Sequence, residues 1–218
     1  MNYGPYHQND ALADWLRIRT EISWPRWSGE YPVTEPLALD GFRDFFTATC
    51  GDRDAERTPR VLTALDRALA DAEQGSQLAF ALMANWQRTV LHRNAVGFRT
   101  MPAFAKDGRE RYGLAPDTHA RFEHCLAESS RPDLPLPSRA ARTYLDVLFF
   151  HPFEDGNARA AMLALAFVLA RDGVSLDQVH PLQATRWADD AEGAADLAVL
   201  LGILITAAGR RLSNGSRS

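Results

Sequence analysis

A short polar segment separates two apolar helical runs in the second half of this chain, and it constrains the fold more than any other feature. Residues 144–150 and 160–170 are strongly apolar and are expected to form buried helices. Between them the chain reads His-Pro-Phe-Glu-Asp-Gly-Asn-Ala-Arg, from His151 to Arg159. These polar side chains must lie in a tight connection between two core helices, where charged residues need a specific role.

The residue types of this turn suit the binding of a phosphate group. A helix that begins at Asn157 directs its unpaired backbone N–H groups, and the positive end of its dipole, at the preceding turn. Gly156 would let the backbone approach a ligand closely, and Arg159 could donate two hydrogen bonds to the same anion. Asp155 beside a phosphate is favourable only when a cation lies between them, which predicts Mg²⁺. His151 has the near-neutral pKa of a general base that accepts a proton from a hydroxyl.

The alternative interpretation gives each of these residues a purely structural role. His151 would then be a hydrogen-bonded core histidine, and residues 155–157 would form an N-cap turn. For any one residue this alternative is the better one. The whole set, in this order and spacing, points instead to one phosphate site.

The segment resembles the signature of the Fic (Fic/Doc) family, His-x-Phe-x-(Asp/Glu)-Gly-Asn-Gly-Arg-x-x-Arg. The matching residues are His151, Phe153, Asp155, Gly156, Asn157 and Arg159. The resemblance extends over about residues 59–173, where the order of predicted elements is similar. It implies an all-α fold, with a Fic-type helical core and a small β-hairpin flap that aligns a target segment by strand pairing. The flap strand would consist of Met101, Pro102, Ala103 and Phe104.

Most members of that family transfer AMP from ATP to a Ser, Thr or Tyr hydroxyl of a target protein. The resemblance therefore implies an ATP-binding nucleotidyltransferase in which His151 is the general base and Asp155 the Mg²⁺ ligand. Phe153 would anchor the loop in the core. The nucleotide contacts would come from Gly156, Asn157, Ala158 and Arg159.

Two positions depart from the signature. Ala158 stands where the family has its second glycine, and Met162 where it has its last arginine. The alanine is tolerable if the helix has already begun there. The methionine removes a charge-assisted contact to the terminal phosphate of ATP, which is worth about 1.5–3 kcal/mol. The donor could therefore be another phosphate compound, such as the diphosphate CDP-choline that some relatives use.

Three functions remain in view. The first is an active Fic-type transferase that acts on a target protein, favoured by the intact His151 and Asp155. The second is a Fic-fold enzyme that uses another donor or a small-molecule acceptor, favoured by Ala158 and Met162. The third is a nucleotide-binding pseudoenzyme, which would have no use for a base and a metal ligand. The family's inhibitory pattern, (Ser/Thr)-x-x-x-Glu-(Gly/Asn), is absent, and the sequence leaves open whether a separate small protein inhibits the enzyme.

The composition is that of a soluble globular protein, with 46% hydrophobic and 24% charged residues. A net charge of −4 argues against a sequence-independent nucleic-acid binder. The apolar stretch 194–208 carries Asp196 and is too broken for a membrane span, and residues 1–10 lack a signal-peptide core. Cys50 and Cys125 have no metal-ligand spacing and are expected to be free thiols. We expect a cytoplasmic protein that binds neither nucleic acid nor membrane.

The chain is expected to divide into an N-terminal helical and extended lobe (1–58), the Fic-like helical domain (59–209) and a disordered tail (210–218). Helices are predicted at 10–22 with Asp10 as N-cap, 39–49, 59–73 with Pro59 first, 76–93, 116–129, 139–150 capped by Ser138, 157–171 and 185–208. The Asp107-Gly108 pair predicts the turn of the hairpin, with strands on either side at 97–101 and 109–112.

Overall fold

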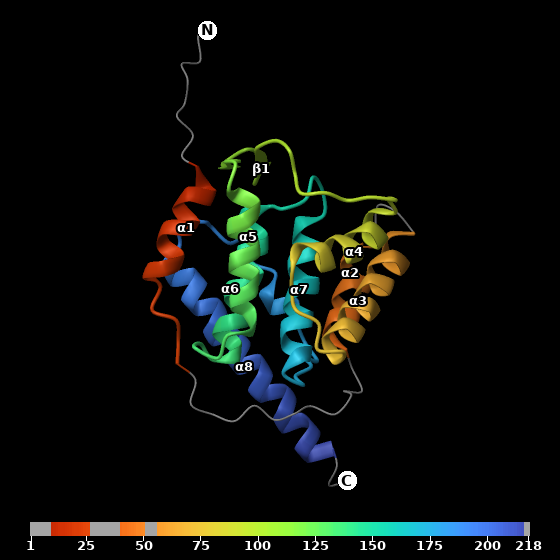
Figure 1. Cartoon of the computed structure of the whole chain (residues 1–218). Coiled ribbons are helices and arrows are strands. Elements are labelled where there is room, and N and C mark those ends of the chain that lie inside the picture. Colours follow the sequence, from red (N-terminus) through yellow and green to blue (C-terminus); the bar gives the residue numbers. More distant parts are fainter. Residues whose placement is uncertain (1–9, 27–39, 51–55, 216–218) are drawn as a thin grey trace.

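The computed structural model describes residues 10–26, 40–50 and 56–215. Within these ranges the chain forms α-helices, two short 3₁₀ helices and one two-stranded hairpin (Figure 1). The expected all-α fold with a small hairpin is confirmed. The elements are α1 (Ala11–Glu21), α2 (Gly41–Cys50), α3 (Arg57–Glu73), α4 (Phe80–Leu91), β1 (Ala103–Ala105), β2 (Glu110–Tyr112), α5 (Thr118–Ala127), η1 (Glu128–Ser130), α6 (Leu136–Phe150), α7 (Asn157–Arg171), η2 (His180–Leu182) and α8 (Ala191–Gly215).

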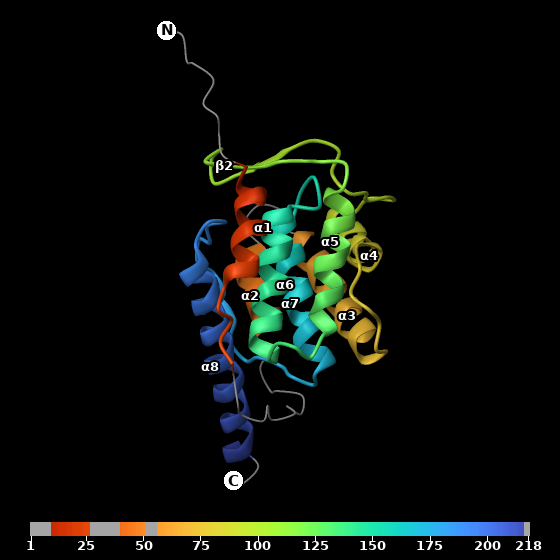
Figure 2. The same cartoon turned by 60° about the vertical axis from the view of Figure 1, so that its left-hand side comes forward.

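Helices α6 and α7 form the centre of the bundle. Their side chains are buried nearly all round. This explains why α7 is apolar on every face after its first turn, whereas α6 also buries polar residues such as Arg142 and Asp146. Helix α7 packs against α3 and α4, whereas α6 packs against α1, α5 and α8. The hairpin and the α6–α7 turn lie at the same end of the bundle in both views (Figures 1 and 2). This arrangement brings the predicted flap and the polar turn together.

The hairpin is shorter than expected and its first strand begins later. Strands β1 and β2 pair antiparallel, with Ala103 opposite Tyr112, and the turn contains Asp107 and Gly108 at φ 57° and 81°. Residues 97–101 lie outside β1, because the Arg99 backbone N–H donates to Pro152 of the polar turn and not to a strand. Of the expected flap strand, only its last two residues belong to β1.

Two helices begin earlier than predicted. Helix α3 starts at Arg57, so Pro59 is its third residue; the proline is tolerated there because N–H groups in the first turn have no partner within the helix. Helix α6 starts at Leu136, and Ser138 is therefore not its cap. The Ser138 hydroxyl instead donates to the carbonyl of Pro25 at 2.8 Å, a partner that no local pattern reveals.

Helices α4 and α8 begin later than predicted. In both cases a carboxylate that is distant in sequence accepts a backbone N–H, at the start of α4 and shortly before α8. The N–H of Phe80, the first residue of α4, donates to the Glu123 carboxylate at 3.1 Å. Before α8, the N–H of Ala188 donates to the buried Glu110 carboxylate at 3.0 Å, which keeps that segment out of the helix. Helix α8 then continues to Gly215, so most of the expected tail is helical, and residues 216–218 lie outside the described ranges.

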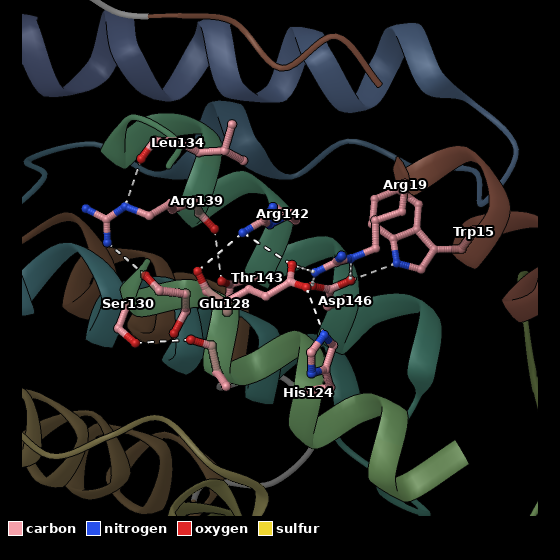
Figure 3. A network of polar contacts seen from close by, with 12 residues as sticks. Trp15, Arg19, His124, Glu128, Ser130, Leu134, Arg139, Arg142, Thr143 and Asp146 are labelled. Carbon is pink, nitrogen blue, oxygen red and sulfur yellow. Dashed lines mark hydrogen bonds and ion pairs between the residues drawn. The ribbon is translucent and has the colours of Figure 1, made fainter. Parts of the chain in front are cut away.

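A buried ion pair fastens α1 to α6 (Figure 3). The Asp146 carboxylate is fully buried and accepts hydrogen bonds from Arg19 Nε (2.7 Å), Arg19 Nη2 (2.8 Å) and Trp15 Nε1 (2.9 Å). Arg19 also donates to Glu128 at 2.9 Å. Helix α1 is thus part of the same core as α6; residues 1–9, 27–39 and 51–55 of the expected N-terminal lobe lie outside the described ranges.

Asp10 caps α1 as predicted and also ties it to the hairpin. Its Oδ1 accepts the N–H of Leu12 at 3.1 Å and the N–H of Gly113, just after β2, at 2.8 Å. Cys50 and Cys125 are free thiols, as expected, and both are buried.

Candidate functional site

His151 ends α6 and faces the cavity beneath the flap. It is the C-cap residue, in the left-handed conformation with φ 48° and ψ 55°, which histidine adopts more readily than most residues. Its Nδ1 lies 2.6 Å from the carbonyl oxygen of Leu148. A carbonyl oxygen only accepts, so Nδ1 carries the hydrogen and Nε2 is left as a proton acceptor. The Tyr112 ring stacks on the imidazole at 4.7 Å and fixes its plane.

The surroundings of His151 keep its imidazole neutral. Burial lowers the pKa of His151 below its ordinary 6.5, and the charges of Arg99 and Lys106 act in the same direction. The hydrogen bond to Leu148 and the charge of Glu110 oppose this without reversing it. A neutral imidazole is the form that can accept a proton.

We predict that His151 titrates below pH 6.5 and that its lowered pKa makes the folded protein less stable in acid. Between the folded pKa and 6.5 the unfolded chain binds more protons, so the free energy of unfolding falls as pH is lowered through that window. Histidine NMR titration, with His151→Asn to assign the resonance, measures the pKa directly. Titration at or above 6.5 would contradict the prediction.

The Asn157 side chain holds the polar turn closed. Its Oδ1 accepts the N–H of Phe153 at 2.9 Å, and its Nδ2 donates to the carbonyl of Phe153 at 2.8 Å. Phe153 itself is 1% exposed and stacks on Phe80 at 5.3 Å. The sequence predicts that Asn157 contributes to a phosphate cradle; the structure uses its side chain to hold the loop and leaves its backbone N–H at the start of α7.

Residue 156 must be glycine because a side chain of α4 approaches its backbone closely. It has φ 78°, and an added Cβ would collide with the Gln87 side chain. Gln87 is fully buried and donates from Nε2 to the carbonyl of Asp155 at 2.7 Å. This bond fixes the backbone just ahead of α7. Sequence reasoning missed Gln87, because it lies more than sixty residues before the turn and matches no motif.

The start of α7 combines anion-binding backbone with one exposed carboxylate. The Asp155 side chain is 63% exposed and lies 3.6 Å from Arg159 Nη2. Over the described ranges, no three His, Cys, Asp or Glu side chains gather into a self-contained metal site. Mg²⁺ is commonly held by one or two carboxylates together with substrate phosphates. Asp155 therefore fits a metal that binds jointly with a phosphate.

A cavity of about 540 Å³ lies between the flap and the polar turn. Its lining includes His151, Phe153, Asp155, Gly156, Asn157 and the flap residues Met101, Pro102, Ala103 and Phe104. The side chains of Met101 and Phe104 are 70% and 58% exposed, so the flap presents an apolar surface beside the catalytic candidate. Most of the predicted site residues therefore meet at this cavity.

The other predicted residues line a second cavity of about 250 Å³. Ala158 and Arg159 lie there with Met162 and Arg57, and none of the lining residues that the structure describes carries a carboxylate. Ala158 is within α7, so the alanine is compatible with the backbone. A third cavity, of about 510 Å³, includes both His151 and Ala158 and so adjoins the other two. Sequence reasoning missed Arg57, which no motif marks.

Arg99 connects the flap to the polar turn. The side chain is buried, with 4% exposure, and its guanidinium donates to the carbonyls of Phe150 (3.2 Å), Met101 (2.7 Å) and Gly113. Arg99 lies within the segment whose order of elements resembles the Fic family, and no motif marks it. Its contacts make it a structural link between flap and turn.

Comparisons with known proteins agree with this geometry. Residues 77–169 match the model of the Fic/DOC family. No curated protein matched the sequence.

Three solved structures share the fold. A Fic domain containing signaling protein from Bacteroides thetaiotaomicron is 22% identical, with a TM-score of 0.54 over 74% of this chain and 71% of that one. IbpAFic2 covalently tethered to Cdc42 is 12% identical, with a TM-score of 0.57 over 88% and 70%. Fic-1 from C. elegans is 14% identical, with a TM-score of 0.50 over 94% and 70%. The matched segment spans the flap, the polar turn and most of α7. The likeness to the Fic/DOC family model therefore covers the residues of the candidate site.

Proposed function

We propose that this chain is a Fic-type transferase that moves AMP, or a related phosphate-linked group, from a nucleotide to a hydroxyl of a target protein. One observation carries the proposal. His151 and Asp155 line the same cavity. His151 supplies a neutral imidazole with an available Nε2, and Asp155 supplies an exposed carboxylate at the N-terminus of a helix. A turn with only a structural role requires neither group.

The site residues divide the reaction between them. The backbone N–H groups at the start of α7 would bind the transferred phosphate, with Arg159 beside them. Asp155 would hold Mg²⁺, which neutralises phosphate charge when bound. Nε2 of His151 would take the proton of the acceptor hydroxyl as its oxygen attacks the phosphorus. The new O–P bond replaces the bond to pyrophosphate, which leaves when ATP is the donor.

The flap would present the acceptor. Strand β1 pairs only with β2 among the described strands, so its other edge is open to an added strand. Met101 and Phe104 offer apolar contacts along this segment. IbpAFic2 has been solved in complex with adenylylated Cdc42, which supports a protein as the target here.

A second candidate is a transferase of the same fold that uses a diphosphate donor. Met162, at 4% exposure, lines the second cavity where a guanidinium could otherwise contact the end of a triphosphate. Arg57 and Arg159 line the same cavity, so it retains positive charge. A positively charged cavity suits a diphosphate donor whose distal group is anionic. It suits CDP-choline less well, because the distal group of CDP-choline is cationic.

Replacing Met162 by arginine should tighten ATP binding. A charge-assisted hydrogen bond of about 1.5–3 kcal/mol corresponds to roughly a tenfold or greater fall in Kd. AMP, which lacks the outer phosphates, should bind as before. Isothermal titration with Mg²⁺ measures both constants, and Met162→Leu is the uncharged control. Equal ATP affinity in the folded arginine and leucine variants would show that this cavity does not hold the outer phosphates.

A binding panel tests the proposed function. Purified protein with Mg²⁺ is titrated with ATP, the other nucleoside triphosphates, ADP, CDP-choline and UDP-sugars. Selective binding of ATP supports AMP transfer, and preference for a diphosphate supports the second candidate. If none of these compounds binds, both candidates are wrong.

A further inference from the structure

The outer face of α8 carries a stripe of exposed side chains whose chemistry changes along the helix. Apart from Met101 and Phe104 of the flap, Val199 and Ile203 are the only large hydrophobic residues that are strongly exposed among the described residues, at 43% and 54%. They lie four positions apart, about one turn of the helix. Figure 2 shows α8 at the edge of the bundle, with one side turned away from α6.

The stripe continues in both directions with polar residues. Glu192 and Asp196 precede its apolar centre, and Thr206 and Arg210 follow it. The spacing alternates between four and three residues, the repeat that keeps one seam of a helix facing a partner helix. Neither carboxylate, nor the Arg210 guanidinium, pairs with a side chain elsewhere in the described ranges, and all three are exposed or solvent-facing.

This stripe is complementary to itself when a second helix runs antiparallel. With Val199 opposite Ile203 of the second copy, Glu192 comes opposite Arg210 and Asp196 opposite Thr206. Every pair is centred on Leu201, so one twofold axis through that residue generates all of them. A parallel alignment would place each charge opposite its own copy, which is unfavourable. Opposite charges therefore meet at both ends only in the antiparallel arrangement.

We propose that the chain forms a homodimer in which two α8 helices pack antiparallel through this stripe, with the twofold axis at the level of Leu201. The stripe is about 27 Å long from Glu192 to Arg210, and one helix pair buries an area at the lower end of the range for specific interfaces. The dimer is therefore weak and concentration-dependent. The proposal is independent of the transfer reaction, because the stripe contains no residue of the candidate site.

A lipid bilayer is the competing occupant, and the observations favour the second copy. Residues Ala191–Arg210 have a mean hydropathy of 1.7 and are long enough to span a membrane, but 44% of that window is buried within the protein. The outward face carries three charged side chains, which are costly to place in hydrocarbon. In the dimer those charges lie at the rim of the interface, where opposite signs meet.

Sedimentation velocity over a range of protein concentrations tests the proposal. The wild-type mass should rise from the monomer value of 24.2 kDa to twice that value, and Ile203→Glu should weaken association at least tenfold. Glu192→Arg and Arg210→Glu should each weaken it, because like charges then face each other. The double variant should restore it. Glu73→Arg, an exposed charge reversal on α3, is the matched control.

Three results would overturn the proposal. The wild type could remain monomeric at every concentration, or the double charge reversal could fail to recover association while circular dichroism shows a folded protein. Co-sedimentation of the monomer with vesicles of mixed phosphatidylcholine and phosphatidylglycerol, lost on Ile203→Glu, would assign the stripe to a membrane instead.

Discussion

Replacement of His151 by alanine is expected to abolish group transfer and leave the fold and nucleotide binding in place. Among the described residues that line the cavity, only His151 carries an imidazole, and its Nε2 is available as an acceptor. Loss of a positioned general base costs about 10²- to 10⁴-fold in rate. The transfer rate, the nucleotide Kd and thermal unfolding are measured on the same preparation.

His92 offers a matched control for this change. It is the C-cap of α4 and has nearly the same left-handed backbone, with φ 52° and ψ 48°, but it is exposed and does not line the candidate cavity. His92→Ala therefore introduces a similar backbone penalty without removing the base, and transfer should persist. Retention of more than about a tenth of the wild-type rate by folded His151→Ala would overturn the base assignment.

Replacement of Asp146 by alanine is expected to be the most destabilising single change in the buried network of Figure 3. It leaves the Arg19 guanidinium, whose side chain is 8% exposed, without its main partner, and it also removes the acceptor of Trp15 Nε1. Breaking a buried ion pair in this way costs about 3–5 kcal/mol. Urea denaturation measures the free energy of unfolding.

The exposed pair Asp117–Arg121 provides the comparison. Its side chains are 56% and 58% exposed, so Asp117→Ala should change stability by about 0–1 kcal/mol. Replacing both Arg19 and Asp146 by apolar residues should recover part of the loss, because neither charge is then left unpaired. A loss of under about 1 kcal/mol for Asp146→Ala would show that α1 is not held by this pair.

Local patterns predicted those elements whose ends are set by their own residues. Helix α7 has the expected bounds because Gly156 and the Asp172-Gly173 stop lie next to it in sequence. Asp10 was identified as a cap for the same reason. The starts of α4 and α8 were missed because they depend on distant partners, Glu123 for Phe80 and Glu110 for Ala188.

The site divides in the same way. The short turn contains the base and the carboxylate together, so the sequence alone identified His151 and Asp155 as candidates. The supports come from elsewhere in the chain, with Gln87 on α4 and Arg99 before the flap, and only packing brings them to the turn. The motif also does not show that the Asn157 side chain holds Phe153, and the contact of Asn157 with a phosphate stays a prediction.

The most direct test of the proposed transfer uses ATP labelled on its α-phosphate. Purified protein, Mg²⁺ and a cell extract as the source of targets are incubated with the labelled nucleotide, and the products are separated under denaturing conditions. The proposal predicts a covalently labelled protein band with the wild type and none with His151→Ala. Absence of label from ATP and from correspondingly labelled diphosphate donors, in a protein shown to bind nucleotide, would contradict it and indicate a nucleotide-binding protein without transferase activity.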